Sequence, residues 1–482
     1  MRIFMAPLPF HYYFIMLFKF IHARLRQAFF ALTLFLGSSI VAHAAMTTPP
    51  LCAEYDGTNL YIAANDGNGT EMCYWFKRCM ANELFTFYRV GQRTVGRNTS
   101  DTEGISKITT WLNATGSDNI GPVGIKGYPD FVGGNHRWRN RDENGNFISG
   151  YSNVRTAQCD SVIVKLDGLP LNTKMNGQQV LVTVWNTLFD PLVAPENGNS
   201  TTLTSPIINE QVEYRIQDNS IDVVLEHKYL KDFVVSTYYG MQSMCNGEDS
   251  IMTPSGKFSA FTAVANCNGG FKKKDYNDFN RYTEHTPNGW CQSAWMRPEG
   301  LGTHQFIGDN SNIFWRGSGK CYHWLMKDSQ VSAGQTHQWN GIYTWALPLV
   351  NDPDLIAYRG IIDQHEALYI DTKQACDRTL PLPDNWKGYY VIESKGEGSI
   401  TRSGNSLHIS ATGPASFIIS KSFKGDVNLD RIVDVEDVND SINYILRTKT
   451  VDFIADINDD NVVDVADVNE IINIILGTPT QA

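Results

Sequence analysis

Two neighbouring runs of sequence decide the fold class: SVIVKLD at residues 161–167 and QVLVTVW at residues 179–185, with Asn176-Gly177 between them. Runs rich in β-branched residues and separated by Asn, Asp or Gly predict antiparallel strands joined by tight turns. Further runs of this kind lie at residues 213–216, 221–226 and 233–238. We therefore predict a mainly β protein with a large antiparallel β-sandwich or jelly-roll body.

The composition of the chain fits a folded body of this kind. Apolar residues make up 42% and aromatic residues 12% of the 482 residues, which is enough to bury a large core and excludes a wholly disordered chain. The formal net charge is −11, whereas a protein that holds phosphate backbones needs a basic excess. We therefore expect no nucleic-acid partner.

Residues 1–44 are predicted to be a secretory signal peptide. They carry four basic and no acidic residues, an apolar run over residues 28–41, and Ala-His-Ala at residues 42–44. This is the order of a cleavable signal. The apolar run is shorter than the roughly 20 residues that span a bilayer, and an N-terminal membrane anchor is the alternative. No later stretch is apolar enough to span a membrane, so we predict a secreted, extracellular protein without membrane contact after cleavage.

All nine cysteines lie after this segment. An oxidising compartment permits disulfides, and Cys73 and Cys79 are close enough in sequence for a local bridge. Nine is an odd number, so at least one thiol stays unbridged within the chain. We expect most of the nine to be small buried apolar residues.

The C-terminal part of the chain contains an internal repeat with a period of 30 residues. DVNLDRIVDVED at residues 426–437 aligns with DINDDNVVDVAD at residues 456–467, in a segment that holds 13 acidic and 3 basic residues between Asp426 and Glu470. Oxygen-bearing side chains at loop positions 1, 3, 5, 9 and 12, with a backbone carbonyl at position 7, are the spacing of a calcium loop. We predict two Ca²⁺ sites. Their ligands are Asp426, Asn428, Asp430, the carbonyl of Ile432, Asp434 and Asp437 in the first loop, and Asp456, Asn458, Asp460, the carbonyl of Val462, Asp464 and Asp467 in the second.

A helix is predicted where each loop closes, because apolar residues recur there at helical spacing. The two predicted stripes are Val438, Ile442, Ile445 and Leu446, and Val468, Ile472, Ile475 and Leu476. We expect both stripes to face a shared core. Two such stripes bury little area, and the loop carboxylates repel one another, so folding of this module is expected to depend on the metal.

These loops and helices, at about residues 422–478, resemble a dockerin, the tandem calcium-loop module that docks enzymes onto cohesin domains of bacterial scaffolds. The resemblance implies a cohesin-type domain or cell-surface scaffold as partner. Loop position 6, where glycine is usual, is Arg431 in the first repeat and Asn461 in the second. Because arginine tolerates a left-handed backbone poorly, the first site is expected to be the weaker one. An acidic solvated tail, or a stabilising module without a cohesin, are the alternatives.

The central region carries no nucleotide-binding motif and no nucleophile elbow. His136 follows Gly133-Gly134, Tyr238-Tyr239 ends a predicted strand, and Glu226 closes the preceding one. A His and a Tyr on facing positions could abstract and donate protons, as in eliminative cleavage of acidic sugars. Paired carboxylates could instead hydrolyse a glycosidic bond. The candidates for such a pair are Glu210, Glu213, Glu226 and Asp222. A structural role is the alternative for each of these residues.

Residues 290–345 are rich in tryptophan, which stacks on the apolar faces of sugar rings. The six residues concerned are Trp290, Trp295, Trp315, Trp324, Trp339 and Trp345. The alternative is that most of them fill the core. Three histidines in the same segment lack the spacing of a metal site.

The predicted organisation is a signal peptide at 1–44, a β-sandwich body at 45–383, a short β segment at 384–421 and the calcium module at 422–482. The function expected is that of a secreted, dockerin-bearing glycoside hydrolase or polysaccharide lyase. This expectation follows from the resemblance, because dockerin-like modules are usually attached to enzymes that degrade polysaccharides. A non-catalytic glycan-binding or cell-surface assembly protein with the same β body is the alternative.

Overall fold

The computed structural model describes most of the chain after residue 50. The described ranges are 51–65, 69–97, 99–109, 111–113, 119–196, 200–244, 250–252, 262–263, 269–277, 279–285, 289–317, 320–383, 386–449 and 453–477. The predicted signal peptide, at 1–44, and the cysteines Cys245 and Cys267 lie outside these ranges. All of the described helices and strands lie within Thr48–Leu476, which is one compact unit.

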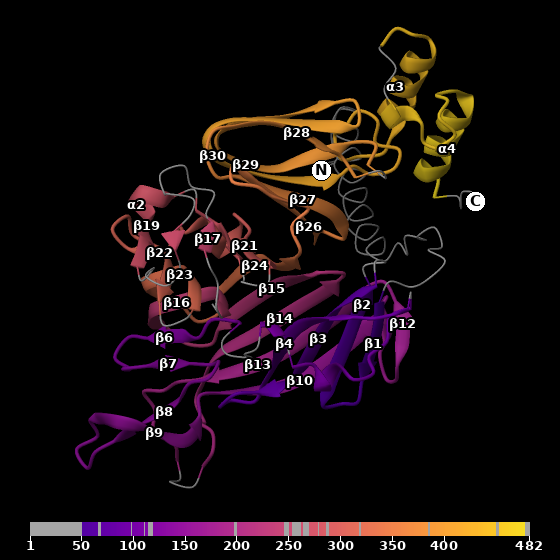
Figure 1. Ribbon diagram of the computed structural model, residues 1–482. Helices are drawn as coiled ribbons and strands as arrows, with labels where there is room; N and C mark the ends of the chain where they lie inside the picture. Colours follow the sequence, from indigo (N-terminus) through magenta and orange to yellow (C-terminus); the bar gives the residue numbers. More distant parts are fainter. Residues whose placement is uncertain are drawn as a thin grey trace, which may run out of the picture. The chain divides into compact units, whose positions relative to one another are not determined.

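A ten-stranded antiparallel sheet forms the centre of the body (Figure 1). Its strands, in spatial order, are β11 (Leu169–Pro170), β10 (Ala157–Leu166), β13 (Val180–Phe189), β14 (Pro206–Gln217), β15 (Ser220–Tyr229), β24 (Thr336–Ala346), β21 (Cys291–Met296), β20 (Arg281–His285), β17 (Ser250–Met252) and β18 (Thr262–Ala263). The prediction of antiparallel strands over residues 161–238 is thus confirmed. One detail is wrong: Asn176-Gly177 is no hairpin turn, because β12 (Met175–Gly177) pairs with β1.

Two six-stranded sheets pack on this central sheet. The first contains β12, β1 (Leu51–Tyr55), β2 (Asn59–Asn65), β3 (Thr70–Cys79), β4 (Leu84–Thr94) and β5 (Trp111–Asn113). The second contains β19 (Gly269–Lys272), β22 (Asn312–Gly317), β23 (Lys320–Val331), β16 (Phe233–Met244), β6 (Val123–Ile125) and β7 (Phe131–Val132). Buried apolar residues of all three sheets form one continuous core, as expected of a β-sandwich. A separate hairpin joins β8 (Arg137–Arg141) to β9 (Phe147–Arg155).

A fourth sheet follows in the chain and crosses the boundary that we predicted at residue 383. Its strands are β25 (Val350–Asn351), β26 (Leu355–Ile362), β27 (His365–Thr372), β28 (Cys376–Pro381), β29 (Tyr389–Ser403) and β30 (Ser406–Lys421). β26 is apolar on both faces, because one face packs on β21 and β24 and the other lies in the sheet's own core. A strand buried on both faces lacks the alternation of polar and apolar residues that marks a strand with one exposed face. The sequence pattern therefore did not show that a new sheet begins before residue 383.

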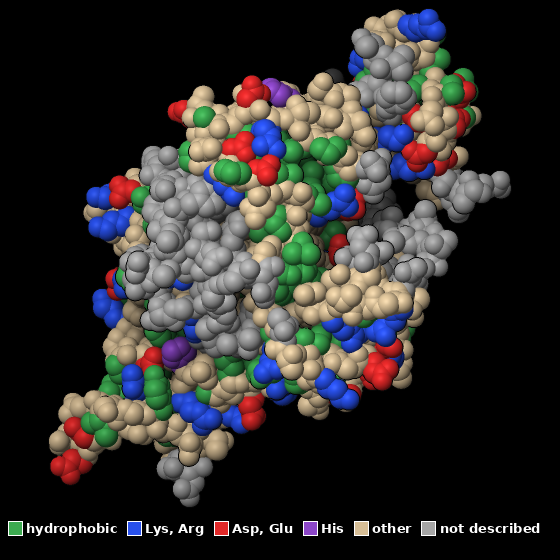
Figure 2. All heavy atoms as spheres, in the orientation of Figure 1, with side chains coloured by type: hydrophobic (Ala, Val, Ile, Leu, Met, Phe, Trp, Pro, Cys, Tyr) green, Lys and Arg blue, Asp and Glu red, His purple; other side chains and the backbone are tan. Residues whose placement is uncertain are grey.

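Helices occur mainly at the C-terminal end. Short helix α2 (Lys273–Tyr276) belongs to the body, whereas α3 (Val435–Ile445) and α4 (Val465–Ile475) follow the two acidic loops. Figure 2 shows several Asp and Glu side chains exposed over this end of the chain, with Lys and Arg among them. The two helices predicted at these positions, and the mainly β class of the chain, are confirmed.

The prediction of which helix faces are buried is partly wrong. Val468 is buried and Val438 packs against the core of the module, as predicted. Ile471, which lies outside the predicted stripes, is the residue of α4 in that core. Ile442 and Leu446, however, are exposed, as are their counterparts Ile472 and Leu476. The core lies against a neighbouring face of each helix, where the small Ser441 is fully buried.

The seven cysteines of the described residues are all thiols, so the predicted bridge between Cys73 and Cys79 does not form. Both residues belong to the extended strand β3. Six residues of strand span roughly 20 Å, far beyond the Cα separation that a disulfide bridges. Burial raises the pKa of the Cys73 thiol to about 12. Six of the seven are buried, as expected. Among the described residues no helix is long and apolar enough to cross a membrane.

Candidate functional site

The candidate site lies on the second six-stranded sheet, where strand β16 has an irregular register. Tyr239 pairs with Trp324 of β23, and Gln242 pairs with Tyr322. Three steps along β16 therefore match two steps along β23, which is the signature of a β-bulge. In a regular strand, residues three apart point to opposite faces. Because of the extra residue, Tyr239 and Gln242 point to the same face.

Hydrogen bonds from the core fix this bulge. The backbone N–H of Gln242 donates to the hydroxyl of buried Tyr343 at 2.9 Å. The Tyr343 hydroxyl also lies 2.8 Å from the Gln242 carbonyl. On the other side of the bulge, the N–H of Gly121 donates to the carbonyl of Gly240 at 2.9 Å. These hydrogen bonds tie the bulge of β16 to its neighbours in the core, so the bulge is a fixed feature of the fold.

A cavity of about 430 Å³ opens on this face of the sheet. Strand β23 contributes every second residue over Lys320, Tyr322 and Trp324, as alternation in a strand requires. The described residues that line it are Pro122, Phe131, His136, Tyr239, Gln242, Asn312, Trp315, Lys320, Tyr322 and Trp324. The structure therefore brings together two of the four residues that we predicted to be catalytic, His136 and Tyr239.

His136 reaches the cavity from the loop that follows β7, and buried Asn82 holds that loop. The Asn82 amide nitrogen is within 3.1 Å of the carbonyls of Gly133, Gly134 and His136. Its carbonyl oxygen accepts from the N–H of Thr156 at 2.9 Å. One buried side chain thus ties the glycine pair and His136 to the start of β10.

The His136 ring is oriented by a carboxylate. Its Nδ1 lies 3.0 Å from Oδ1 of Asp130, and Arg139 Nε lies 3.2 Å from the other carboxylate oxygen. Burial alone raises the pKa of Asp130, but hydrogen bonds from His136 and Tyr151 outweigh burial and leave that pKa below its usual value. An ionised Asp130 accepts the hydrogen on Nδ1, so Nε2 is left as the basic nitrogen of the ring.

Tyr239 lies among aromatic rings in the cavity wall. Its ring centroid is 5.2 Å from those of Phe131 and Tyr322 and 5.4 Å from that of Trp324. The Phe131 ring is also 5.2 Å from the His136 ring, so it contacts both candidates. Burial raises the pKa of Tyr239 to about 12. Tyr239 therefore keeps its proton at neutral pH and can serve as a donor.

Two polar groups in the cavity wall lack partners. Gln242 is 1% exposed, and neither atom of its amide has a hydrogen-bond partner among the described residues. The same holds for the indole N–H of Trp324. Buried polar groups without partners are costly, and a bound ligand or water normally satisfies them. The sequence analysis missed Gln242, because only the bulge turns it toward Tyr239.

The other two predicted catalytic residues lie elsewhere. Tyr238 points into the core, where its hydroxyl accepts from the indole N–H of Trp339 at 2.7 Å. Glu226 is exposed on β15, opposite Gln338 of β24. Successive side chains of a strand point to opposite faces. Tyr238 therefore points away from the cavity that Tyr239 lines, and Glu226 points away from the core.

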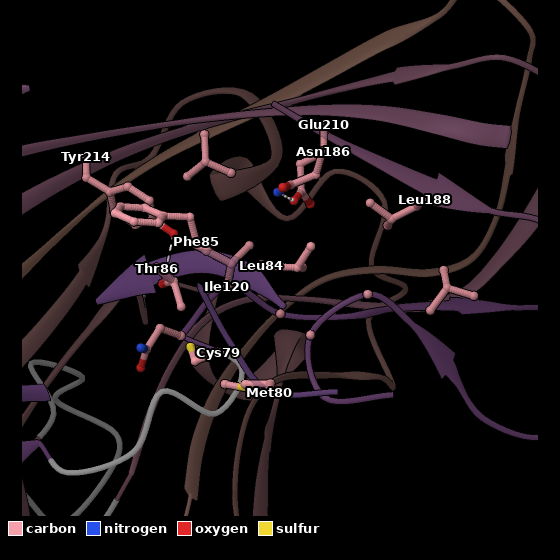
Figure 3. A pocket seen from close by; sticks show the side chains of 16 residues that line it. Cys79, Met80, Leu84, Phe85, Thr86, Ile120, Asn186, Leu188, Glu210 and Tyr214 are labelled. Atoms are coloured by element: carbon pink, nitrogen blue, oxygen red, sulfur yellow. Dashed lines mark hydrogen bonds between the residues drawn. The ribbon is translucent and has the colours of Figure 1, made fainter. Parts of the chain in front are cut away.

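The predicted carboxylate pair does not form at the cavity either. Among Glu213, Asp222 and Glu210, only Glu210 is fully buried, and it bonds to Nε2 of His227 at 2.8 Å and to the Asn186 amide at 2.7 Å. Glu210 and Asn186 face a separate cavity in the sandwich core (Figure 3). At about 30 Å³, this cavity has room for water but not for a sugar.

The tryptophans of residues 290–345 divide between core and cavity. Trp290, Trp295, Trp339 and Trp345 are buried in the core, so the alternative that most of the six are structural is correct. Trp315, which is 36% exposed, and Trp324 line the cavity instead.

The two acidic loops have matching geometry. In the first loop, Oδ1 of Asp437 accepts from the N–H groups of Val427 and Asn428 at 2.7 and 3.1 Å. In the second loop, Oδ1 of Asp467 accepts from Ile457 and Asn458 at the same distances. Position 9 of each loop caps the following helix. Four loop carboxylates, at positions 1 and 12, are almost fully buried; they are Asp426, Asp437, Asp456 and Asp467.

Buried carboxylates of this kind fit a bound cation, because burying charge without compensation is expensive. Within the described residues, no three or more His, Cys, Asp and Glu side chains group as a metal site.

Residues that precede the module contact the first carboxylate of each loop. The hydroxyl of Tyr390 donates to Asp426. The ammonium of Lys387 lies 3.1 Å from Oδ2 of Asp456 and 2.9 Å from Oδ1 of Asp459. Arg431, whose φ is +75°, lies with its guanidinium 5.2 Å from the ring of Tyr390.

Comparisons with known proteins give partial structural similarities. No family model and no curated protein matches the chain. The galactosidase domain of an alpha-galactosidase–sucrose kinase is 10% identical over 62% of this chain and 41% of its own, with a TM-score of 0.31. The Synechocystis sp. PCC 6803 protein Slr1438 is 10% identical over 63% of this chain and 99% of its own, with a TM-score of 0.30.

A heparinase III gene product is 9% identical over 66% of this chain and 40% of its own, with a TM-score of 0.26. The chain thus spans less than half the length of two of these three proteins. We assign neither fold nor function from similarities of this size.

Proposed function

We propose that this chain is an exported enzyme that cleaves a polysaccharide at the cavity of the second six-stranded sheet. The observation that carries the proposal is the meeting of His136, oriented by Asp130, with the protonated phenol of Tyr239 in one cavity. One group can accept a proton and the other can donate one, as cleavage of a glycosidic bond requires.

The walls of the cavity suit a sugar. Aromatic rings stack on the apolar faces of sugar rings, and amide and indole N–H groups bond to hydroxyls. Trp315, Tyr322 and Trp324 supply the rings, and Gln242 supplies an amide without a partner. A cavity of about 430 Å³ is within the size range of small-molecule sites.

The test is the release of new reducing ends from a panel of polysaccharides by the chain without residues 1–44. We expect turnover on at least one glycan, and a loss of roughly 10²–10⁴-fold in kcat for His136→Ala, as is typical when a general base is removed. His408→Ala is the matched control, because His408 also bonds to an aspartate, Asp377, but lies on β30. Equal losses in both variants would contradict the proposal.

A second candidate function is glycan binding without catalysis, which the same aromatic wall favours. It predicts that Trp324→Ala lowers glycan affinity while no glycan yields new ends. Isothermal titration alongside the end-group assay separates the two functions. Binding without turnover on every glycan would establish the second.

We further propose that the C-terminal module binds two Ca²⁺ ions and tethers the protein to a cohesin-type domain or cell-surface scaffold. The module exposes apolar residues in matched pairs, one from each repeat. The exposed fractions are 59% and 54% for Ile432 and Val462, 64% for both Val435 and Val465, and 66% and 69% for Leu446 and Leu476. Exposed large apolar side chains that recur in both repeats are the residues with which the module would meet a protein partner.

The tether is tested by titrating a panel of cohesin domains with the chain in calcium and in chelator. We expect calcium-dependent binding to at least one, weakened by at least tenfold in Leu446→Asp/Leu476→Asp. Exposed Leu169→Asp, in β11 of the body, is the control. Binding that is changed neither by chelation of calcium nor by the leucine substitutions would contradict the proposed tether.

A further inference from the structure

We propose that the cavity takes a uronic acid unit of the polysaccharide and cleaves the chain beside it by β-elimination. This inference rests on the proposed function and adds to it the substrate class and the bond that breaks. The described wall of the cavity carries a lysine and no carboxylate, whereas the protein as a whole has a net negative charge.

Among the described residues that line the cavity, none is Asp or Glu, and Asp130 lies behind His136. Hydrolysis by the common route uses two carboxyl groups that flank the scissile bond. The described wall offers a base and a phenol acid instead, and these two groups suffice for an elimination.

The wall instead carries groups that suit an anion. Lys320 and Asn312 line the cavity with Gln242, whose buried amide has no partner in the described part of the chain. Gln242 lies in a row with Tyr322 and Trp315, across three neighbouring strands. An amide N–H and an ammonium are both donors to a carboxylate. A uronate stacked on this row would place its carboxylate within reach of these donors.

The reaction then balances without any further reagent. His136 Nε2 takes the proton from C5, the carbon that bears the carboxylate, and the electron pair forms a C4=C5 double bond. The C4–O bond to the neighbouring sugar breaks, and the Tyr239 hydroxyl protonates the leaving oxygen. One fragment gains an unsaturated uronate end and the other a reducing end. Proton exchange with water restores His136 and Tyr239.

The negative charge that develops in this step falls on the carboxylate. Donors aimed at that position stabilise the transition state more than the bound substrate. Gln242 and Lys320 are therefore expected to affect kcat as well as KM. A sugar of the same shape without the carboxylate has neither the acidic C5 proton nor the partner for these donors.

The experiment compares uronate polymers with their carboxyl-reduced forms, using the chain without residues 1–44. Polygalacturonate, alginate, hyaluronan and heparan sulfate are each assayed for reducing ends and for the ultraviolet absorbance of unsaturated ends. We expect cleavage of at least one uronate form, one unsaturated end for each reducing end, and no cleavage of its reduced partner. Reducing ends without unsaturated ends, or equal cleavage of the reduced form, would overturn the inference and leave the proposed function standing. No new ends from any polysaccharide would overturn both.

Variants connect the result to this cavity. Gln242→Glu keeps the shape and adds a like charge, and Lys320→Met removes the cation at a less buried position. We expect each to lower kcat/KM on the uronate polymer by at least tenfold, and Lys320→Arg to restore part of the loss. Lys228→Met, at an exposed position of β15, is the control. Unchanged kcat/KM in Lys320→Met and in a folded Gln242→Glu protein would contradict the assignment of the carboxylate to these donors.

Discussion

The cavity of the second six-stranded sheet and the calcium loops of the C-terminal module are built in opposite ways. The cavity gathers residues from Pro122 to Trp324, on several strands and two connecting segments, and has no acidic residue on its described wall. Each calcium loop places its carboxylates within 12 consecutive residues. The cavity depends on the register of a large sheet, whereas we propose that each acidic loop depends on a bound cation.

The cores beneath the two sites differ as much as the sites. Three sheets share the core of the body, but among the described residues the core cluster of the module has five buried members: Val427, Ile454, Ala455, Ile457 and Ile471. We expect a core of that size to hold the buried carboxylates in place only when a metal is bound. Changes of conditions should therefore separate the two regions cleanly.

The largest difference is expected on removal of calcium. Chelation should melt α3 and α4, because the buried Asp437 and Asp467 then repel their neighbours, while the sheets persist. Far-UV circular dichroism of the chain with and without chelator measures this. Asp437→Ala/Asp467→Ala should reproduce the loss in calcium, whereas exposed Glu436→Ala should not. Helix content that stays the same after chelation and in the double Asp→Ala variant would contradict the calcium assignment.

The second-largest effect is expected on the stability of the body when the pH is lowered. Burial, with Lys273 and Lys395 nearby, lowers the pKa of His304 to about 4, and burial lowers that of His323 to about 3. Between about pH 6.5 and these values the unfolded chain binds more protons, so each histidine removes up to about 1.4 kcal/mol of stability per pH unit as the pH falls. Above pH 6.5 neither contributes.

Urea unfolding followed by tryptophan fluorescence measures this effect, because all 11 tryptophans precede the calcium module. His323→Gln should flatten the dependence on pH, because it removes one of the two buried histidines with a lowered pKa. A body whose stability is constant between pH 7 and 4 would contradict these pKa shifts.

A smaller effect is expected where the fold positions the site. Asn82→Ala removes the side chain that ties Gly133, Gly134 and His136 to β10. Displacing a catalytic group by about 1 Å can cost roughly 10²-fold, so we expect kcat to fall by about 10- to 100-fold with little change in KM. Steady-state kinetics measures the split. Asn340→Ala, whose amide bonds to Glu299, is the control, and equal falls in both variants would indicate a general loss of stability.

The smallest effect concerns the atypical residue in the first calcium loop. Arg431 has φ +75° and Asn461 has φ +67°, and a left-handed backbone costs arginine roughly 1–2 kcal/mol. Arg431→Gly removes this cost but also the contact with Tyr390, worth about 0.5–1 kcal/mol. We expect calcium to bind the first loop a few-fold more tightly, by two-site titration calorimetry. Asn461→Gly should change the second loop less; a larger change there would reverse the expected order of the sites.

The same contrast explains what could be predicted from the sequence. The capped helices after the two acidic loops follow from spacing within about 20 residues, and strands such as β13 and β14 follow from local alternation. The exposed faces of Ile442 and Leu446 were missed, because helical periodicity alone does not say which apolar face packs.

The register between strands that lie far apart in the chain could not be predicted from the sequence. His136 and Tyr239 could be named from residue type, but their neighbours Tyr238 and Glu226 looked equally suitable. Only the pairing of β16 with β23 and its bulge separates Tyr239 from Tyr238 and brings in Gln242. Nothing in the local sequence around Asn82 points to its hold on the His136 loop, because the two are 54 residues apart.

The adjacent tyrosines of β16 offer the most direct test of the central claim, that protons move at Tyr239 in the cavity. Tyr239→Phe and Tyr238→Phe remove the same hydroxyl from opposite faces of one strand. On a polysaccharide that the chain cleaves, we predict that Tyr239→Phe lowers kcat by roughly 10²-fold or more, while Tyr238→Phe lowers stability and keeps the kcat of the folded enzyme. Full turnover in Tyr239→Phe, or an equal loss in both, would contradict the account.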